Sequence, residues 1–295
     1  MTHVATLIAP QSLRDEHLVH AREALPSPGA PEWLAPGIAA DIAFTPDGAF
    51  DQRGVSEKLR AALAGTPIDV VVQPVAHRRK KLFVADMDST MIGQECIDEL
   101  ADYAGLKAHV AAITERAMRG EIDFEPALRE RVALLKGLPV SVIEEVLRER
   151  IVLTPGGRAL VATMRKHGAY ACLVSGGFTH FTNSVRAEVG FDEDRSNSLI
   201  VEGGKLAGLV KEPILGREAK LVSLRELTAT LKLSPQDTMA IGDGANDLAM
   251  IEAAGLGVAY HAKPAVAAAA HARIDHCDLT SLLYAQGYRK EEFAA

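Results

Sequence analysis

Leu82-Phe83-Val84-Ala85-Asp86-Met87-Asp88-Ser89-Thr90 is the stretch that decides the fold of this chain. Its first four residues form a short apolar run, which predicts a buried strand of an α/β sheet. Asp86 and Asp88 then stand at the carboxyl end of that strand, where open α/β sheets place their ligand sites. Two carboxylates this close repel each other unless a cation or a proton lies between them. The pair is therefore a candidate site for chemistry rather than for packing.

The chain after Lys81 alternates between strands and helices. This alternation predicts an α/β fold, a Rossmann-like doubly wound and mostly parallel sheet. Residues 93–149 read as almost wholly helical, which predicts a helical insertion above the sheet. A Gly-Gly pair at 203–204 predicts a hairpin between residues 199 and 206. The expected strands are 82–85, 170–174, 238–241 and 257–259, and the expected helices are 157–167, 218–231, 248–254 and 265–272.

A smaller α+β layer is expected before residue 80. It would contain strands 4–8, 38–44 and 68–72 and helices 15–25 and 55–64, interrupted by the Pro- and Gly-bearing stretch 26–37. We expect an N-terminal domain over residues 1–76 and a second domain over 81–295, with a helical cap at about 93–153. The basic run Arg78-Arg79-Lys80-Lys81 is short and lacks interleaved aromatic residues, so we expect a solvated linker rather than a nucleic-acid site.

Composition limits the classes of function. The 295 residues carry a net charge of −7, which gives no general attraction to nucleic acid or to anionic membranes. The chain has no secretory signal and no run of about 18 apolar residues, so we expect neither export nor a membrane span. Its three cysteines are far apart and in no metal-type spacing, which favours a reduced, cytoplasmic setting.

Polar side chains that could hold a phosphoryl group or a metal ion recur at strand ends and helix starts. The hydroxyl of Ser175 and the amides that follow it can hold a phosphoryl oxygen, because glycine lets the backbone approach an anion closely. Lys220, near a predicted helix start, can neutralise charge on a transferred group. Asp243 and Asp247 follow the strand 238–241, and with Asp86 they offer the oxygen ligands that Mg²⁺ prefers. Together these groups indicate phosphoryl transfer.

Each element alone has a simpler explanation. Ser-Gly-Gly and Asp-Gly are common turns, and a lysine on a helix is usually solvated. The Asp-x-Asp pair differs from a calcium loop, because Met91 stands where that loop needs glycine. The ordered combination of all four elements is what favours a functional site.

At this point the chain resembles the haloacid dehalogenase superfamily, and within it the phosphoserine phosphatase family. The resemblance covers about residues 81–283 and rests on four motifs: Asp86-Met87-Asp88-Ser89-Thr90, Ser175-Gly176-Gly177-Phe178, Lys220 and Gly242-Asp243-Gly244-Ala245-Asn246-Asp247. It implies hydrolysis of phosphoserine, the last step of phosphorylated serine synthesis, through an aspartyl-phosphate. The alternatives left open are a related small-molecule phosphatase or phosphotransferase and an inactive amino-acid sensor.

The resemblance also assigns roles to residues. Asp86 would be the nucleophile, and Asp88 would protonate the leaving oxygen and then activate water. The Asp86 carboxylate, the Asp88 backbone carbonyl and Asp243 would bind Mg²⁺, and Asp247 would fix Lys220 or a metal-bound water. The phosphoryl group would be held by Ser175, Gly176, Lys220 and Asn246.

Substrate selection is expected from the cap. Phosphoserine carries an ammonium and a carboxylate, which the resemblance matches to Glu95 and Arg131, with Met118 and Phe124 as apolar cover. An arginine fork suits a carboxylate because it binds both oxygens.

The first 76 residues resemble an amino-acid-binding domain of ACT type. The stretch Ala9-Pro10-Gln11-Ser12 differs from the Asp-x-Pro-Gly turn that such domains often carry. We therefore expect this unit to form a homodimer or to pack beside the catalytic domain.

Overall fold

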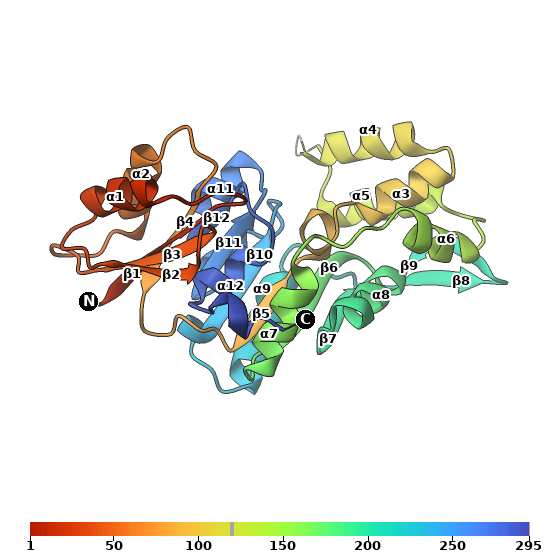
Figure 1. Cartoon of the computed structure of the whole chain (residues 1–295). Helices are drawn as coiled ribbons and strands as arrows, with labels where there is room; N and C mark the ends of the chain where they lie inside the picture. The colour runs from red at the N-terminus through yellow and green to blue at the C-terminus, as the bar shows by residue number, and fades with distance from the viewer. Residues whose placement is uncertain (119–120, 295) are drawn as a thin grey trace.

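Three parts are visible in the computed structural model of the chain, which describes residues 1–118 and 121–294 (Figure 1). An N-terminal α+β unit lies on one side, a six-stranded sheet covered by helices lies in the centre, and a group of helices stands beyond it.

The central sheet is parallel throughout, in the order β12-β11-β10-β5-β6-β7. Strand β5 (Leu82–Ala85) lies in the middle, and all four of its side chains are buried. An uninterrupted apolar run is what a strand covered on both faces requires. The other strands are β6 (Tyr170–Phe178), β7 (Glu193–Asn197), β10 (Thr238–Gly242), β11 (Leu256–Tyr260) and β12 (Ala272–Ile274).

Side chains of β5 alternate between two apolar layers, because successive residues of a strand point to opposite faces. Leu82 and Val84 belong to a cluster that includes α9 and α10, whereas Phe83 and Ala85 belong to the cluster that includes α7 and α8. The sheet is therefore doubly wound, as the sequence predicted. The helices are α7 (Gly157–Lys166), α8 (Thr179–Val189), α9 (Ala219–Thr230), α10 (Leu248–Ala253), α11 (Pro264–Ala269) and α12 (Ser281–Ala285).

The cap is inserted between β5 and α7. Its two connections to the sheet run side by side, since Ile92 pairs with Leu153 and the Gly93 N–H donates to the Val152 carbonyl at 3.0 Å. A two-stranded hairpin packs beneath the cap, against α5 (Figure 1). The cap helices are α3 (Cys96–Tyr103), α4 (Lys107–Met118), α5 (Phe124–Leu134) and α6 (Ser141–Glu149), and the hairpin strands are β8 (Leu199–Glu202) and β9 (Lys205–Val210).

The N-terminal unit is a four-stranded antiparallel sheet in the order β2-β3-β1-β4. Its βαββαβ element order is that of a ferredoxin-like unit. The ACT-type resemblance stays a prediction. The elements are β1 (His3–Ile8), α1 (Asp15–Ala24), β2 (Pro31–Ala35), β3 (Ala39–Phe44), α2 (Gln52–Ala62) and β4 (Asp69–Pro74).

Several elements differ from the sequence prediction. The stretch 26–37, expected to be irregular, contains β2, whose Pro31 is tolerated because β2 is an edge strand. The predicted helix 265–272 ends at Ala269 and is followed by the short strand β12. Helix α8 and strand β7 were not predicted.

The segment 78–81 is only in part the solvated linker that the sequence analysis expected, since Arg79 and Lys81 are exposed but Arg78 and Lys80 are not. Arg78 forms a half-buried ion pair with Asp41 (2.6 Å) and donates to the Ala285 carbonyl (2.8 Å), so it joins the N-terminal sheet to α12. Lys80 is buried and donates to the Gln236 carbonyl at 2.8 Å. Arg78 tolerates this burial because acceptors from both units surround its guanidinium, and Lys80 because the Gln236 carbonyl accepts from its ammonium.

Among the described helices, none is long and apolar enough to cross a membrane.

Candidate active site

Asp86 and Asp88 follow β5 at the carboxyl edge of the sheet. Asp86 is 4% exposed, and its Oδ1 accepts the Met87 N–H at 2.8 Å. Asp88 is half-buried, and its Oδ1 accepts the Cys96 N–H from the first turn of the cap at 3.2 Å. Both carboxylates are thus fixed by backbone amides. The chain between them and the cap turns sharply, with Ser89 at a left-handed φ of 55°.

Lys220 joins the first motif to the last. Its Nζ lies 2.6 Å from Asp86 Oδ1 and 2.6 Å from Asp247 Oδ1, and all three side chains are buried. Burial opposes the charge on Lys220, but the carboxylates of Asp247 and Asp86 outweigh it and raise the pKa of the ammonium. Lys220 therefore stays cationic where an anionic group would be held.

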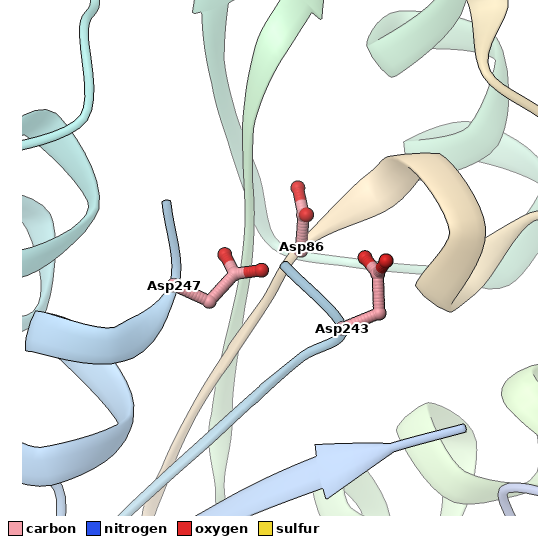
Figure 2. A group of neighbouring side chains, drawn as sticks. All are labelled: Asp86, Asp243 and Asp247. Carbon is pink, nitrogen blue, oxygen red and sulfur yellow. The ribbon is translucent and has the colours of Figure 1, made fainter. Parts of the chain in front are cut away.

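Three carboxylates converge beside this lysine. Oxygens of Asp86, Asp243 and Asp247 all lie within 4.8 Å of one another, and Figure 2 shows their side chains gathered from β5, the turn after β10 and the start of α10. Burial, then the charge of Asp247, raises the pKa of Asp86 well above its usual range and that of Asp243 to about 6. This excess of negative charge and the hard oxygen donors fit a divalent cation such as Mg²⁺.

Backbone glycines make this convergence possible. A Cβ on Gly242 would lie 2.2 Å from the Asp247 Cγ, and one on Gly244 would lie 2.3 Å from the Asn246 Oδ1. The side chains of Asn246 and Asp247 therefore fold back over the turn only because these two positions lack a side chain. Asp247 Oδ2 also accepts the Gly244 N–H at 3.1 Å.

Ser175 and the two glycines after it lie within β6 rather than after it. The sequence predicted that the strand ends at Val174, but β6 continues to Phe178, with a register shift against β7 between Val174 and Phe178. The Ser175 hydroxyl accepts the Gly177 N–H at 2.8 Å. A Cβ on Gly177 would lie 3.0 Å from both Asp88 Oδ2 and Ser175 Oγ, which shows how closely the second motif approaches the first.

Glu95 lies at the entrance to the cap, where it accepts the Ser89 hydroxyl at 2.8 Å. Solvent reaches its side chain, but the protein encloses the carboxyl on most sides. This loss of surrounding water, with the nearby Asp88 charge second, raises the pKa of Glu95 to about 7. Glu95 thus lies between the carboxylates of the first motif and the cap.

Arg131 points from α5 toward the same acidic region. It donates to the Ala127 carbonyl (3.3 Å) and to Thr114 Oγ1 (3.4 Å). Burial lowers the pKa of Arg131, and the carboxylates of Asp98, Glu95 and Asp88 oppose that change.

Phe124 begins α5 and covers the second motif. A Cβ on Gly176 would lie 3.1 Å from its ring carbon Cζ. Met118 ends α4, and its side chain lies outside the part of the chain that the structure describes.

Two neighbours of the site were not predicted from the sequence. Asp98 of α3 is the first carboxylate that acts on Arg131. Lys263 precedes α11, its N–H donates to the Asp243 carbonyl at 3.1 Å, and its charge acts on both Asp243 and Glu95. The available signal for Lys263 was its position just after strand 257–259, at the same edge of the sheet as Asp86 and Asp243.

The sequence profile of the haloacid dehalogenase-like hydrolases matches residues 83–252. A phosphoserine phosphatase from Polaromonas sp. is 51% identical over 224 residues, which are 74% of this chain and 95% of that protein.

The chain belongs to the phosphoserine phosphatase family of haloacid dehalogenase-like hydrolases.

Other members of the phosphoserine phosphatase family agree with this placement. The phosphoserine phosphatase of Streptomyces coelicolor is 44% identical over 246 residues, which are 81% of this chain but only 60% of that longer protein. A crystal structure of a phospho-aspartyl intermediate analogue of phosphoserine phosphatase is 39% identical, with a TM-score of 0.65 over 70% of this chain and 98% of the other.

Similarity to a haloacid dehalogenase family hydrolase from Salmonella enterica serovar Typhi extends over both units. That structure is 27% identical, with a TM-score of 0.86 over 96% of this chain and 97% of the other. The predicted family and fold class are thus confirmed, whereas the domain boundaries and the roles of individual residues stay predictions.

Proposed function

We propose that the protein is a Mg²⁺-dependent phosphoserine phosphatase, which hydrolyses O-phospho-L-serine to L-serine and phosphate in the last step of serine biosynthesis. The observation that supports this most is the contact of Lys220 with both Asp86 and Asp247, beside the carboxylate of Asp243. This contact places the proposed nucleophile Asp86 and the cation of Lys220 next to the carboxylates that would bind the metal. The family relatives named as phosphoserine phosphatases point to the substrate.

In the first step, an oxygen of Asp86 forms a bond to phosphorus while the bond from phosphorus to the serine oxygen breaks. Asp88 gives its proton to that departing oxygen. Its raised pKa supports this role, because the carboxyl holds a proton more readily than an ordinary aspartate. The product of this step is serine and an aspartyl-phosphate on Asp86.

In the second step, water attacks the phosphorus of the aspartyl-phosphate and gives a proton to Asp88. The bond between phosphorus and the Asp86 oxygen breaks, and phosphate leaves. Lys220, the Ser175 hydroxyl and the Gly176 amide hold the phosphoryl oxygens through both steps, and Asn246 lies beside them. These groups stabilise charge spread over the transferred group, which is the main requirement of phosphoryl transfer.

Mg²⁺ would be held by Asp86, the Asp88 carbonyl and Asp243, and when bound it supplies positive charge at the phosphoryl group. Asp247 contributes by orienting Lys220, through the 2.6 Å contact between Asp247 Oδ1 and the ammonium.

The cap selects the substrate. Glu95 faces the substrate ammonium, Arg131 faces its carboxylate, and Phe124 covers the apolar side, with Met118 as a further part of that cover. The carboxylates of Asp98, Glu95 and Asp88 support this arrangement, because all three oppose the lowering of the Arg131 pKa. The site is thus built for a phosphate monoester that also carries an α-amino acid group.

Replacement of the nucleophile tests the reaction. We expect Asp86→Asn to abolish phosphate release from phosphoserine and to abolish labelling of the protein by ³²P-phosphoserine in an acid quench. The exposed Asp47 provides the control, since Asp47→Asn makes the same change on a distant loop. Residual turnover in Asp86→Asn with an intact phosphoenzyme would show that another residue is the nucleophile.

Replacement of Arg131 on α5 tests the proposed preference for phosphoserine over simple phosphate esters. Arg131→Ala should raise KM for phosphoserine about tenfold or more while leaving p-nitrophenyl phosphate hydrolysis near the wild-type rate, because loss of one charge-assisted hydrogen bond costs roughly 1.5–3 kcal/mol. Arg129→Ala is the matched control, because Arg129 lies on the same helix but pairs with Glu212 at the surface. An unchanged preference for phosphoserine in Arg131→Ala would contradict the proposed pocket.

An acceptor competition assay, with another small alcohol added, distinguishes hydrolysis from phosphoryl transfer, because only transfer yields a new phosphate ester. A homodimer through the N-terminal unit and a cytoplasmic location stay predictions, and the first can be measured by light scattering of the full chain.

A further inference from the structure

A basic recess lies between the N-terminal unit and the catalytic unit, away from the residues assigned above. Its volume is about 340 Å³, and it is lined by α2 on one side and by residues 267–273 of α11 and β12 on the other. This volume is within the range of small-molecule sites, which begin at about 300 Å³. Both lining elements are labelled in Figure 1.

The lining of the recess carries more basic than acidic side chains. Arg53 and Arg60 line it from α2 and Arg273 from β12, whereas Glu57 is the acidic residue of the lining. Arg53, Glu57 and Arg60 recur at helical spacing, so they share one face of α2. A local excess of positive charge is notable in a chain whose net charge is −7.

Each of the three guanidinium groups makes a contact within the protein, and each has further N–H groups that can donate. Arg53 Nη2 donates to the Ala269 carbonyl at 2.5 Å, Arg60 Nη1 to Glu57 at 2.7 Å, and Arg273 Nε lies 3.0 Å from Asp275. A guanidinium has five N–H donors, so each retains donors for a further acceptor. Anchoring also reduces the entropy lost when a ligand binds.

The arginine charges, after burial, also affect two groups that line the recess. Burial, then the charge of Arg273, lowers the pKa of Arg60. Burial, then the charge of Arg53, lowers the pKa of His271. His271 Nδ1 accepts the Gly257 N–H at 2.9 Å, so its remaining proton is on Nε2 and the ring lines the recess as a neutral donor.

We propose that this recess is a binding site for a small dianion, of the phosphate-ester or dicarboxylate class, held by Arg53, Arg60 and Arg273. An arginine guanidinium can donate two N–H groups to two oxygens of a phosphate or of a carboxylate. A dianion would accept from the guanidinium N–H groups that remain after the contacts of Arg60 with Glu57 and of Arg273 with Asp275. Because the donors come from both sides of the junction, the occupant would join the N-terminal unit to the catalytic unit.

The test uses the full chain and defined anions. Sulfate and malonate serve as probes of the two classes, each titrated by calorimetry at constant ionic strength against chloride. We expect at least one of them to bind, and Arg60→Gln and Arg53→Gln each to weaken that binding about tenfold, the value of one charge-assisted contact. Lys58→Gln is the matched control, since Lys58 is exposed on the same helix but does not line the recess. The probe that binds more tightly identifies the class.

The position of the bound anion is tested by crystallising the chain with selenate, whose selenium gives an anomalous signal. A peak among the three guanidinium groups, clear of neighbouring molecules, supports the site. Selenate found only at Lys220, or only as an adventitious ion at a lattice contact, would overturn it. Equal weakening by Lys58→Gln would also overturn it, because that result would reflect general charge. If Arg60→Gln does not fold, Arg53→Gln decides the outcome, since that side chain is exposed.

Discussion

Asp243→Asn should make the metal-free protein more stable while removing its response to magnesium. The Asp243 carboxyl sits beside Asp86 and Asp247, and burial followed by the Asp247 charge raises its pKa from 3.8 to about 6. A carboxyl whose pKa is higher in the folded chain than in the unfolded chain destabilises the fold once it ionises. Asparagine has nearly the same shape and carries no charge, so it removes that cost.

The pKa difference sets the size of the effect. At about 1.4 kcal/mol per pKa unit, a rise from 3.8 to about 6 corresponds to an upper limit of about 3 kcal/mol. Solvent reaches part of the Asp243 side chain, and screening reduces the expected gain to about 1–2 kcal/mol. The difference in free energy of unfolding depends on pH, because the Asp243 carboxyl ionises as pH rises. The wild type loses stability relative to the variant between about pH 4 and 6, and the variant has its full advantage at pH 8.

Urea unfolding at pH 8 measures this difference, with EDTA in one series and Mg²⁺ in the other. Magnesium at ten times its Kd should stabilise the wild type by about 1.4 kcal/mol and the variant by much less. Asp47→Asn, on an exposed loop, should respond to magnesium as the wild type does. The reasoning is refuted if Asp243→Asn is less stable than wild type in EDTA, or if magnesium stabilises both equally.

Two further substitutions test the packing around the site. Gly177→Ala places a Cβ 3.0 Å from Asp88 Oδ2 and Ser175 Oγ. We therefore expect kcat to fall about 10- to 100-fold with little change in melting temperature. An unchanged kcat would show that the Asp88 and Ser175 side chains can shift freely. Asp69 is buried and accepts three backbone N–H groups of residues 275–277 at 2.8–3.2 Å, so Asp69→Asn should lower the free energy of unfolding by about 1.5–3 kcal/mol, as urea titration would measure.

The central part of the fold was predictable because its signals are local. Strand β5 is a continuous apolar run, and the turn 242–247 begins at the end of another, so the sequence itself placed Asp86 and Asp243 at one edge of a parallel sheet. Strand β7 (Glu193–Asn197) was missed because it is a polar edge strand with no apolar pattern. Strand β12 has only three residues, too few for a periodicity to appear.

The surroundings of the site were less predictable than its centre. Arg131 interacts with Asp98 and Thr114, and these contacts depend on how α3, α4 and α5 pack, which no spacing along the chain specifies. Lys263 has an exposed side chain on a polar turn, so its sequence context is that of any solvated lysine. Arg78 was misread for the same reason: a charged run looks solvated unless the acceptors that bury it are known.

The N-terminal unit is connected to the catalytic turn by a short series of hydrogen bonds. Asp69 of β4 accepts the Cys277 N–H at 2.9 Å, and the Cys277 carbonyl lies 3.1 Å from His261 Nε2, which must carry the proton because a carbonyl only accepts. Two residues later, the Lys263 N–H donates to the Asp243 carbonyl at 3.1 Å. The hydrogen bonds of Asp69, Cys277, His261 and Lys263 all involve backbone atoms, so they hold the backbone of these segments in place. Loosening the loop at Asp69 would therefore remove support from the turn that carries Asp243. The N-terminal unit therefore helps to position Asp243, the proposed metal ligand, beside a different sheet.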